Sequence, residues 1–423
     1  MAPKIKILQN GLRYLILPRS SVRTVAMVVF VKTGVEYETK RINGVSHLLE
    51  HMLFKGTDKR PHPRLVSEEL DAIGATSNAY TGREITAYWG KSTKDKFQKM
   101  FELLADIYMN SRLDAGELEK EKGVVIEEIN MCEDTPVRRV HDLYAELLFG
   151  NQPAGWDIAG SKESVRRISR EDISSYRDKH YVAPNTVVAI AGGISKSKAE
   201  TLIKKYFNSL SKRSGGARKS VKVRQLKPKC LLKYKASDQD HLILGVRTWS
   251  MFDKRRYILE VIGEILAGGS SSRLYHRLRN ELGAAYYIHS NVDLGIDYGT
   301  LSVSCGADHK KTRVVLKSIL REYEDLSSVP VSDRELSRAK NHLIGEMMTG
   351  LETPLDEAEY FGMSELLRKR IISPEETMRK IREVTAKDIL QVAKEIFIAR
   401  HLNLAVIGPY RNEKQLLSLL KIK

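Results

Sequence analysis

The chain has 423 residues, of which 42% are hydrophobic and 29% are charged, and its formal net charge is +17 at pH 7. At roughly 150 residues per domain, this length predicts two to four domains with substantial cores. No apolar stretch is long enough for a transmembrane helix, so the composition excludes a membrane-spanning chain and general disorder. The positive charge makes nucleic acid, anionic membranes and acidic proteins the first partners to consider.

The beginning of the chain predicts folded structure rather than a targeting segment. Residues 4–8 and 12–17 alternate in polarity around Asn10-Gly11, which is typical of a β-hairpin. The segment has neither the apolar core of a signal peptide nor the composition of a transit peptide. The three cysteines are far apart and form no CxxC pair, which favours a reducing compartment. We therefore expect a cytoplasmic protein that does not insert into membranes.

Most of the excess positive charge lies near the middle of the chain. Twelve Lys and Arg residues, and no acidic residue, lie between Glu200 and Asp238. The centre of this stretch contains Ser-Gly-Gly at 214–216 and little apolar periodicity, which is typical of a linker. The sequence therefore predicts a basic, flexible and solvated linker at residues 208–229.

Three segments recur on either side of this linker at nearly constant spacing. The pairs are 168–173 with 384–389, 31–33 with 246–248, and 135–136 with 353–354, at offsets of 216, 215 and 218. Repetition at one spacing over most of a chain indicates duplication of a structural unit. We therefore expect homologous domains at residues 1–207 and 230–423.

The predicted elements follow the same order in both halves. After the hairpin, the first half has a strand at 24–31, a helix at 44–54, a strand region at 76–89, helices at 94–112 and 115–131, and a late strand at 186–191. The matching elements of the second half are 242–248, 255–267, 286–305, 311–326, 332–348 and 402–407. The pattern predicts the α+β class, with two homologous domains related by pseudo-twofold symmetry. Each would be a mixed, largely antiparallel sheet covered by helices.

The sharpest motif is the HxxEH pattern formed by His47, Glu50 and His51 on the predicted helix 44–54. Positions i and i+4 lie on one face of a helix, so both imidazoles can reach one metal ion. Two histidines with a third ligand, usually a carboxylate, suit a catalytic zinc site with one position open to water. A neighbouring carboxylate that is not a ligand can accept the proton of that water.

The motif and its flank, HLLEHMLFKGT at 47–57, resemble the pitrilysin-type inverted zincins, and among them the mitochondrial and bacterial processing peptidases. The resemblance covers essentially the whole chain and implies a zinc-dependent endopeptidase with one Zn²⁺ per chain. It implies Glu128 as the third zinc ligand, Glu50 as the base that activates zinc-bound water, and Glu121 as an orienting carboxylate. Glu121 and Glu128 are seven residues apart and share a face of the predicted helix 115–131.

A second part of the resemblance lies in the second half of the chain. Residues 272–286 are similar to a family segment whose arginine and tyrosine reach the substrate from the C-terminal domain, and these residues are Arg279 and Tyr286 here. The resemblance implies that both hold the substrate backbone and stabilise the oxyanion.

Residues 77–81 resemble the family's edge strand, which pairs with an extended peptide through backbone hydrogen bonds. The substrate-binding residues implied by this resemblance are Asn78, Ala79, Tyr80 and Thr81.

The repeat predicts that the second domain has no metal site. An offset of 215 from the HxxEH motif reaches 262–266, which contain no histidine, and Glu346, which corresponds to Glu128, has no expected partner. The resemblance therefore implies one catalytic domain and one domain that walls a chamber for peptides or unfolded segments. It also implies a homodimer, since one chain carries both sets of residues.

Two alternatives belong to other functional classes. Some relatives are nonenzymatic scaffold subunits of a respiratory cytochrome complex, but the intact HxxEH motif and Glu128 argue against that function. A nucleic-acid-binding protein would explain the charge, but the chain has no RNP, KH or zinc-finger pattern. We therefore expect a peptide substrate and no nucleic-acid partner.

Overall fold

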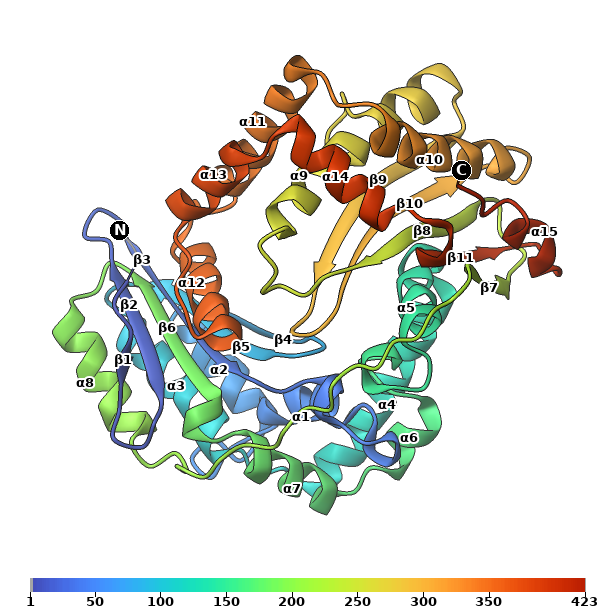
Figure 1. The fold of residues 1–423 in the computed structure, drawn as a ribbon. Coiled ribbons are helices and arrows are strands. Elements are labelled where there is room, and N and C mark those ends of the chain that lie inside the picture. The colour runs from blue at the N-terminus through green and yellow to red at the C-terminus, as the bar shows by residue number, and fades with distance from the viewer. Residues whose placement is uncertain (1–2, 423) are drawn as a thin grey trace. The chain divides into compact units, whose positions relative to one another are not determined.

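The computed structural model describes residues 3–422, which form two compact units that alternate along the chain (Figure 1). The first unit contains Met1–Asn130, Trp156–Lys219 and Gly350–Ser373, and the second contains Met131–Gly155, Ser220–Thr349 and Pro374–Lys423. The sequence predicts two continuous domains at residues 1–207 and 230–423. In the structure, each unit also contains one segment from the other half of the chain.

The first unit is built on a six-stranded mixed sheet. Its strands, in spatial order, are β1 (Lys6–Ile7), β2 (Arg13–Pro18), β6 (Thr186–Gly192), β3 (Thr24–Val31), β5 (Thr86–Thr93) and β4 (Thr76–Thr81). Only β2 and β6 pair in parallel, and all other neighbours are antiparallel. Because β4 pairs with β5 and with no other strand of residues 3–422, it forms an edge of the sheet.

The second unit repeats this topology with five strands. Their spatial order is β7 (Lys229–Tyr234), β11 (Leu402–Gly408), β8 (Asp240–Thr248), β10 (Gly299–Ala307) and β9 (Ala285–Leu294). Here too the first strand pairs in parallel with the late strand, and the other pairs are antiparallel. The predicted α+β class with mixed, largely antiparallel sheets is confirmed. The strand regions predicted at 76–89 and 286–305 each contain two antiparallel strands.

Helices cover both faces of the first sheet. One face packs against helices that include α1 (Val45–Leu53), α3 (Phe97–Asn110), α4 (Ala115–Asp134), α7 (Arg170–His180) and α8 (Lys196–Phe207). The other face packs against α12 (Pro354–Arg368). Strand β3 is buried on both sides, because Met27 packs in the core on the α1 side of the sheet and Phe30 packs in the core on the α12 side. Helices α2 (Pro63–Ala72) and α6 (Lys162–Arg167) also belong to this unit.

The second sheet is covered in the same manner. One face packs against helices that include α9 (Arg256–Ala267), α10 (Thr312–Ser328), α11 (Asp333–Thr349), α13 (Pro374–Glu383), α14 (Ala386–Ile396) and α15 (Glu413–Leu417). The other face packs against α5 (Pro136–Phe149). Among residues 3–422, no helix combines the length and the apolar character needed to cross a membrane.

The two halves of the chain therefore exchange one helix each. Helix α5 follows α4 in the first half but packs on β11 and β8, whereas α12 from the second half packs on β3 and β6. The repeated pairs Thr135-Pro136 and Thr353-Pro354 begin these helices, with proline in the first turn, where its missing N–H costs nothing. The repeat was visible in the sequence, but an amphipathic pattern does not specify which sheet a helix covers.

A second repeated feature fixes the helices α7 and α14. Ser169 accepts a hydrogen bond from the N–H of Asp172, whose side chain accepts one from the Ser169 N–H. Thr385 and Asp388 make the same reciprocal pair 216 residues later. These capping boxes satisfy backbone donors at both helix starts, which explains why this part of the repeat is readable in the sequence.

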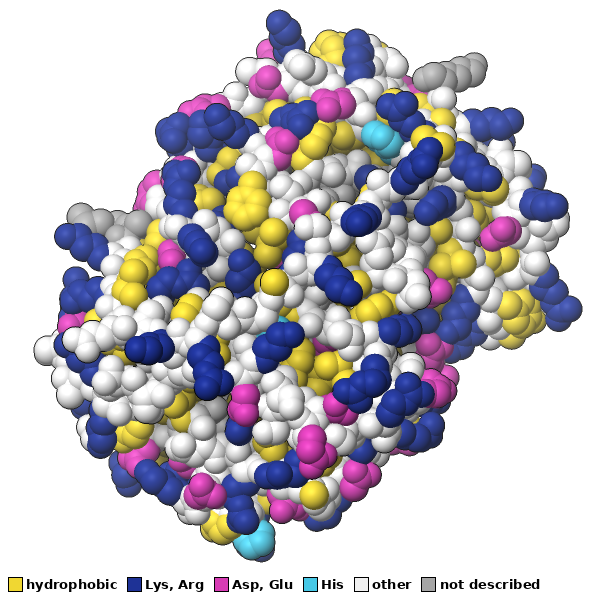
Figure 2. Space-filling model, turned by 60° about the horizontal axis from the view of Figure 1, so that its bottom comes forward, with side chains coloured by type: hydrophobic (Ala, Val, Ile, Leu, Met, Phe, Trp, Pro, Cys, Tyr) yellow, Lys and Arg dark blue, Asp and Glu magenta, His cyan; other side chains and the backbone are white. Residues whose placement is uncertain are grey.

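The basic stretch predicted as a solvated linker is largely irregular and exposed, but one of its charges is buried. The Arg218 side chain is 8% exposed and pairs with Glu36 at 3.0 Å and Glu84 at 3.8 Å, all within the first unit. The buried carboxylates explain this position, since they need a cation once removed from water. Elsewhere, Lys and Arg are scattered among Asp and Glu over the face drawn in Figure 2.

Truncation of Phe361 tests the contribution of α12 to the first unit. Phe361 is buried between α12 and the sheet, where a Cβ on neighbouring Gly362 would collide with Phe30. We expect Phe361→Ala to lower the free energy of unfolding by about 3–5 kcal/mol, because it leaves a cavity in that core. Thermal denaturation followed by calorimetry measures this loss. The matched truncation Phe252→Ala, at a half-exposed site, should have little effect, and equal effects of the two would contradict the packing.

Candidate metal centre

The helix that carries the HxxEH motif is anchored by a buried carboxylate outside the motif. Glu38 accepts hydrogen bonds from the backbone N–H groups of Gly44 at 2.8 Å and Ser46 at 2.9 Å, and from the Asn43 amide at 2.9 Å. Gly44 has a φ of 96°, which favours glycine, and a Cβ there would lie 2.5 Å from the Ala159 carbonyl oxygen. These hydrogen bonds satisfy free N–H groups at the start of α1, and burial raises the pKa of Glu38 to about 7 although the same hydrogen bonds act to lower it.

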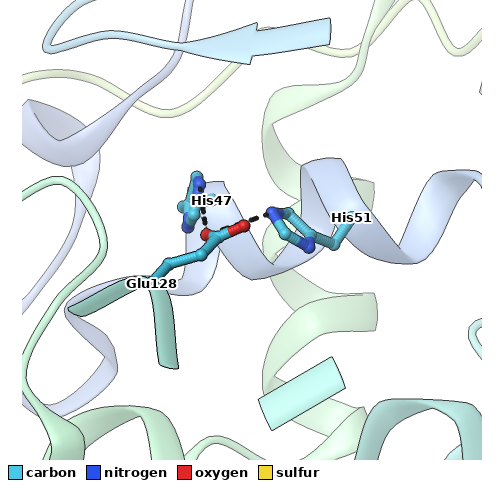
Figure 3. Close-up of side chains that lie close together, drawn as sticks. All are labelled: His47, His51 and Glu128. Atoms are coloured by element: carbon cyan, nitrogen blue, oxygen red, sulfur yellow. Dashed lines mark ion pairs between the residues drawn. The ribbon is translucent and has the colours of Figure 1, made fainter. Parts of the chain in front are cut away.

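His47 and His51 lie one turn apart on α1, and the carboxylate of Glu128 from α4 reaches both (Figure 3). Glu128 Oε2 is 3.7 Å from Nε2 of each histidine, and the two rings are 4.7 Å apart between centroids. Ligand atoms about 2.0–2.1 Å from a tetrahedral zinc ion lie roughly 3.4 Å from one another. The two imidazoles and the carboxylate therefore fit a zinc ion.

The electrostatic state of His47 also suits a metal ligand. Burial, together with the neighbouring His51, lowers the pKa of His47 to about 4. Its imidazole is therefore neutral at neutral pH and keeps a lone pair for a metal ion.

Glu121 lies behind His51, two turns before Glu128 on α4. Its Oε2 is 3.1 Å from Nδ1 of His51, and its Oε1 is 2.6 Å from Nζ of Lys55. A carboxylate at this ring nitrogen fixes the orientation of the imidazole, so that the opposite Nε2 points towards Glu128. The orienting role that the resemblance implies for Glu121 stays a prediction, and this contact gives it a way to be tested.

Glu50 is buried beside the three candidate ligands. Burial raises the pKa of Glu50 above its usual value, with a further contribution from Glu128, whereas the hydrogen bond from Thr81 and the nearby His51 act in the opposite direction. Thr81 stands at the end of β4 and donates its hydroxyl to Glu50 Oε2. A carboxylate with a raised pKa is suited to accept a proton and pass it on.

The remaining residues expected on the substrate strand face different neighbours. Ala79 packs towards the core beneath α1, whereas Tyr80 packs towards α12. Asn78 accepts a hydrogen bond from the backbone N–H of Ala79 at 2.9 Å. All lie on β4, which is an edge strand as expected.

Arg279 and Tyr286 belong to the second unit, where the structure brings them together. Arg279 lies on the π-helical turn Tyr275–Glu281 and donates to the backbone oxygen of Tyr286, at the start of β9. Its guanidinium is 5.9 Å from the centre of the Tyr286 ring, which is within the range of a cation–π contact. Tyr286 is 70% exposed, so its hydroxyl is available to another molecule.

The expectation that Glu346 has no partner is wrong. Its Oε2 lies 3.8 Å from Nδ1 of His342, one turn earlier on α11, and Oε1 of Glu264 on α9 lies 2.8 Å from the same nitrogen. The repeat equivalents of the HxxEH motif, residues 262–266, lie on α9 and contain no histidine, whereas the histidine of this cluster lies on α11.

Comparisons with known proteins agree over nearly the entire chain. The family model "Insulinase (Peptidase family M16)" matches residues 14–162, and "Peptidase M16 inactive domain" matches residues 167–343. A Bacillus subtilis protein named an uncharacterized zinc protease is 31% identical over 404 residues, covering 96% of this chain and 98% of that protein. A Mycobacterium tuberculosis protein with the same description is 31% identical over 419 residues, covering 98% and 95%. The chain belongs to peptidase family M16.

Solved structures show the same M16 fold. A protease from Helicobacter pylori has a TM-score of 0.90 and 22% identity, covering 97% of this chain and 100% of that chain. A structure of complex III2 from Candida albicans contains a chain with a TM-score of 0.85 and 18% identity, covering 99% of both chains.

The sequence did not predict the side-chain contacts of two residues at this M16 site. Glu38 supports α1 from a preceding loop, and its only sequence signal is an acidic residue shortly before the helix. Thr81 was expected on the substrate strand, which stays a prediction, and the contact of its side chain with Glu50 was not expected. Both contacts are tertiary, so no periodic pattern predicts them.

Replacing Glu121 tests whether it supports His51. Glu121→Gln keeps an oxygen near Nδ1 but removes the charge that strengthens His51 as a ligand, so we expect zinc affinity to fall about 10–100-fold. Competition with a chelator of known affinity measures the change. The control Glu127→Gln alters an exposed carboxylate on α4 that accepts from Asn130, and should leave the affinity unchanged. An unaltered affinity in Glu121→Gln would remove its orienting role.

Proposed function

We propose that this M16 chain is a zinc-dependent endopeptidase of the processing-peptidase type that cleaves peptides or unfolded segments. The observation that carries the proposal is the convergence of His47, His51 and Glu128 around one point, with the buried carboxylate of Glu50 beside them. The names of the relatives, which are zinc proteases, support the same chemistry.

In this proposal, His47, His51 and Glu128 hold the ion, and each residue around them has one task. Bound zinc would polarise the peptide carbonyl and lower the pKa of a water molecule. Glu50 accepts the proton of the attacking water at its carboxylate and passes it to the leaving amine, as its raised pKa favours. The Thr81 hydroxyl holds this carboxylate in place.

Substrate binding in this proposal uses backbone recognition. An extended peptide would add to the free edge of β4, which accepts many sequences because main-chain hydrogen bonds supply the contacts. Arg279 and Tyr286 would hold the peptide backbone and stabilise the oxyanion from the second domain. A chamber between the domains and a homodimer, each implied by the family resemblance, complete the proposal.

A peptide library tests the proposal directly. We would incubate the full chain with a mixture of unstructured peptides after zinc loading, after chelation and after readdition of zinc, and identify products by mass spectrometry. Cleavage should appear with zinc, disappear on chelation and return on readdition. A zinc-loaded protein without cleavage would contradict the proposal and favour a nonenzymatic scaffold, the alternative raised by the sequence.

Tyr286→Phe tests the role proposed for the second unit. Loss of one hydroxyl that stabilises an oxyanion should lower kcat by about 10²-fold, while zinc content stays unchanged. Cleavage kinetics and metal analysis on the same preparation measure both quantities. Tyr234→Phe removes a hydroxyl from another exposed tyrosine of the second unit and should leave kcat unchanged. Zinc loss in Tyr286→Phe would contradict the assignment.

A further inference from the structure

The second unit contains its own cluster of metal-ligating side chains. One atom from each of Glu264, His342 and Glu346 lies within 4.8 Å of the others, as do the corresponding atoms of His47, His51 and Glu128. Helices α9 and α11 supply these groups and pack against each other. Glu346 stands at the repeat position of Glu128, 218 residues earlier, so the cluster joins the counterparts of α1 and α4.

The charges of this cluster call for a cation. Glu264 is buried, with its side chain 7% exposed, and within residues 3–422 no Lys or Arg forms an ion pair with Glu264 or Glu346. Glu264 also lies in the last turn of α9, where the free carbonyl groups add negative potential. Glu264, Glu346 and the C-terminal end of α9 therefore contribute negative charge or potential, and His342 is the one basic side chain paired with the two carboxylates among residues 3–422. A buried carboxylate is costly unless a cation compensates it.

Two glycines after α9 let the side chains of the cluster approach the backbone closely. Gly268 and Gly269 follow α9 directly, and a Cβ on Gly268 would collide with the Glu264 carboxylate. A Cβ on Gly269 would lie 3.1 Å from Nε2 and Cε1 of His342. The two glycines therefore keep the carboxylate and the ring clear of side chains.

We propose that Glu264, His342 and Glu346 form a second zinc site, distinct from the HxxEH centre. One imidazole and two carboxylates are a ligand set that Zn²⁺ accepts, and water would complete the coordination. Because His342 and Glu346 are 44% and 58% exposed, this ion exchanges with solvent more readily than the ion at the first centre. The second domain, expected from the sequence to lack a metal site, then binds zinc without the HxxEH motif.

Metal binding to the full chain tests this site. We would strip the protein of metal, titrate it with ZnCl₂ in equilibrium dialysis, and analyse metal content at each free zinc concentration. The wild type should bind two ions, one tightly and one more weakly. His342→Gln should keep the tight ion and lose the weak one, whereas His51→Gln should do the opposite. His276→Gln, which changes another exposed histidine paired with a glutamate in the second unit, should keep both.

A second variant and a second readout guard against misfolding of one variant. Glu346→Gln alters an exposed side chain and should also lose the weak ion, without change in the metal-free melting temperature. Zinc above the dissociation constant of the weak site should raise the melting temperature of His51→Gln, because the ion binds only the folded chain. That increase should be absent from the double variant His51→Gln/His342→Gln.

Other outcomes would overturn the site. Binding of a single ion by the wild type, or a weak ion that survives in both His342→Gln and Glu346→Gln, would mean that Glu264 and His342 form only a hydrogen-bonded ion pair. Loss of the weak ion in His276→Gln as well would indicate unspecific surface binding. These readouts are independent of peptide cleavage, so the second zinc site and the proposed peptidase activity can fail separately.

Discussion

Replacing Glu50 by Gln should leave zinc bound and reduce peptide cleavage by about 10²–10⁴-fold, the usual contribution of a positioned general base. The amide has the size of the carboxylate, and its oxygen can still accept the hydrogen bond from the Thr81 hydroxyl. The structure around α1 and β4 should therefore be unchanged. The amide cannot accept a proton from the attacking water, so the variant should lose peptide hydrolysis and keep zinc binding. The three candidate zinc ligands are untouched by this change.

Steady-state cleavage of a peptide found in the library, together with metal analysis, measures both parts of this result. The expected pattern is a low kcat, one tightly bound equivalent of zinc and an unchanged melting temperature. Glu68→Gln, on the exposed side of α2, is the matched control and should behave as the wild type. Full turnover by Glu50→Gln would exclude Glu50 as the base, and loss of zinc would place it among the ligands.

Replacing Glu128 by Ala should remove the tight zinc ion and abolish cleavage with it. Loss of a partner that only orients a ligand already costs about 10–100-fold in metal affinity, so the loss of a ligand itself should cost more than about 100-fold. The two histidines would remain on α1 with a neutral His47, but two ligands hold zinc poorly at an open site.

Dialysis against buffer without metal, followed by metal analysis, distinguishes the variants. The wild type should retain its tight equivalent and Glu128→Ala should not. Glu346→Ala is the matched control from the repeat-equivalent position in the second unit, and it should retain the tight ion. A full tight equivalent in Glu128→Ala would contradict its assignment as a ligand.

Local patterns predicted those parts of the structure that depend on one helix or strand. The spacing of His47 and His51 predicted a shared helix face, and α1 presents both Nε2 atoms to Glu128. The strand predicted at 24–31 has the bounds of β3, because its apolar run is buried on both faces. The prediction that Glu128 on α4 completes this centre rested on the family resemblance, since a helical pattern alone does not specify which helix lies next to it.

The parts that were missed depend on tertiary contacts. Glu38 reaches α1 from a loop, and Arg218 is buried against carboxylates far from it in sequence. The cluster around His342 was not predicted, because the repeat offset carries the HxxEH motif onto α9, whereas the histidine that pairs with Glu264 lies on α11. A constant offset predicts topology better than it predicts side-chain chemistry.

The exchange of α5 and α12 has a consequence for how the chain is made. During synthesis, domains generally fold from the N-terminus as they leave the ribosome. Here the first sheet keeps one apolar face uncovered until Pro354–Arg368 has been translated, although its last strand ends at Gly192. The nascent chain therefore lacks the helix that covers this apolar face while residues 193–353 are being translated, so the first half of the chain cannot complete its own core.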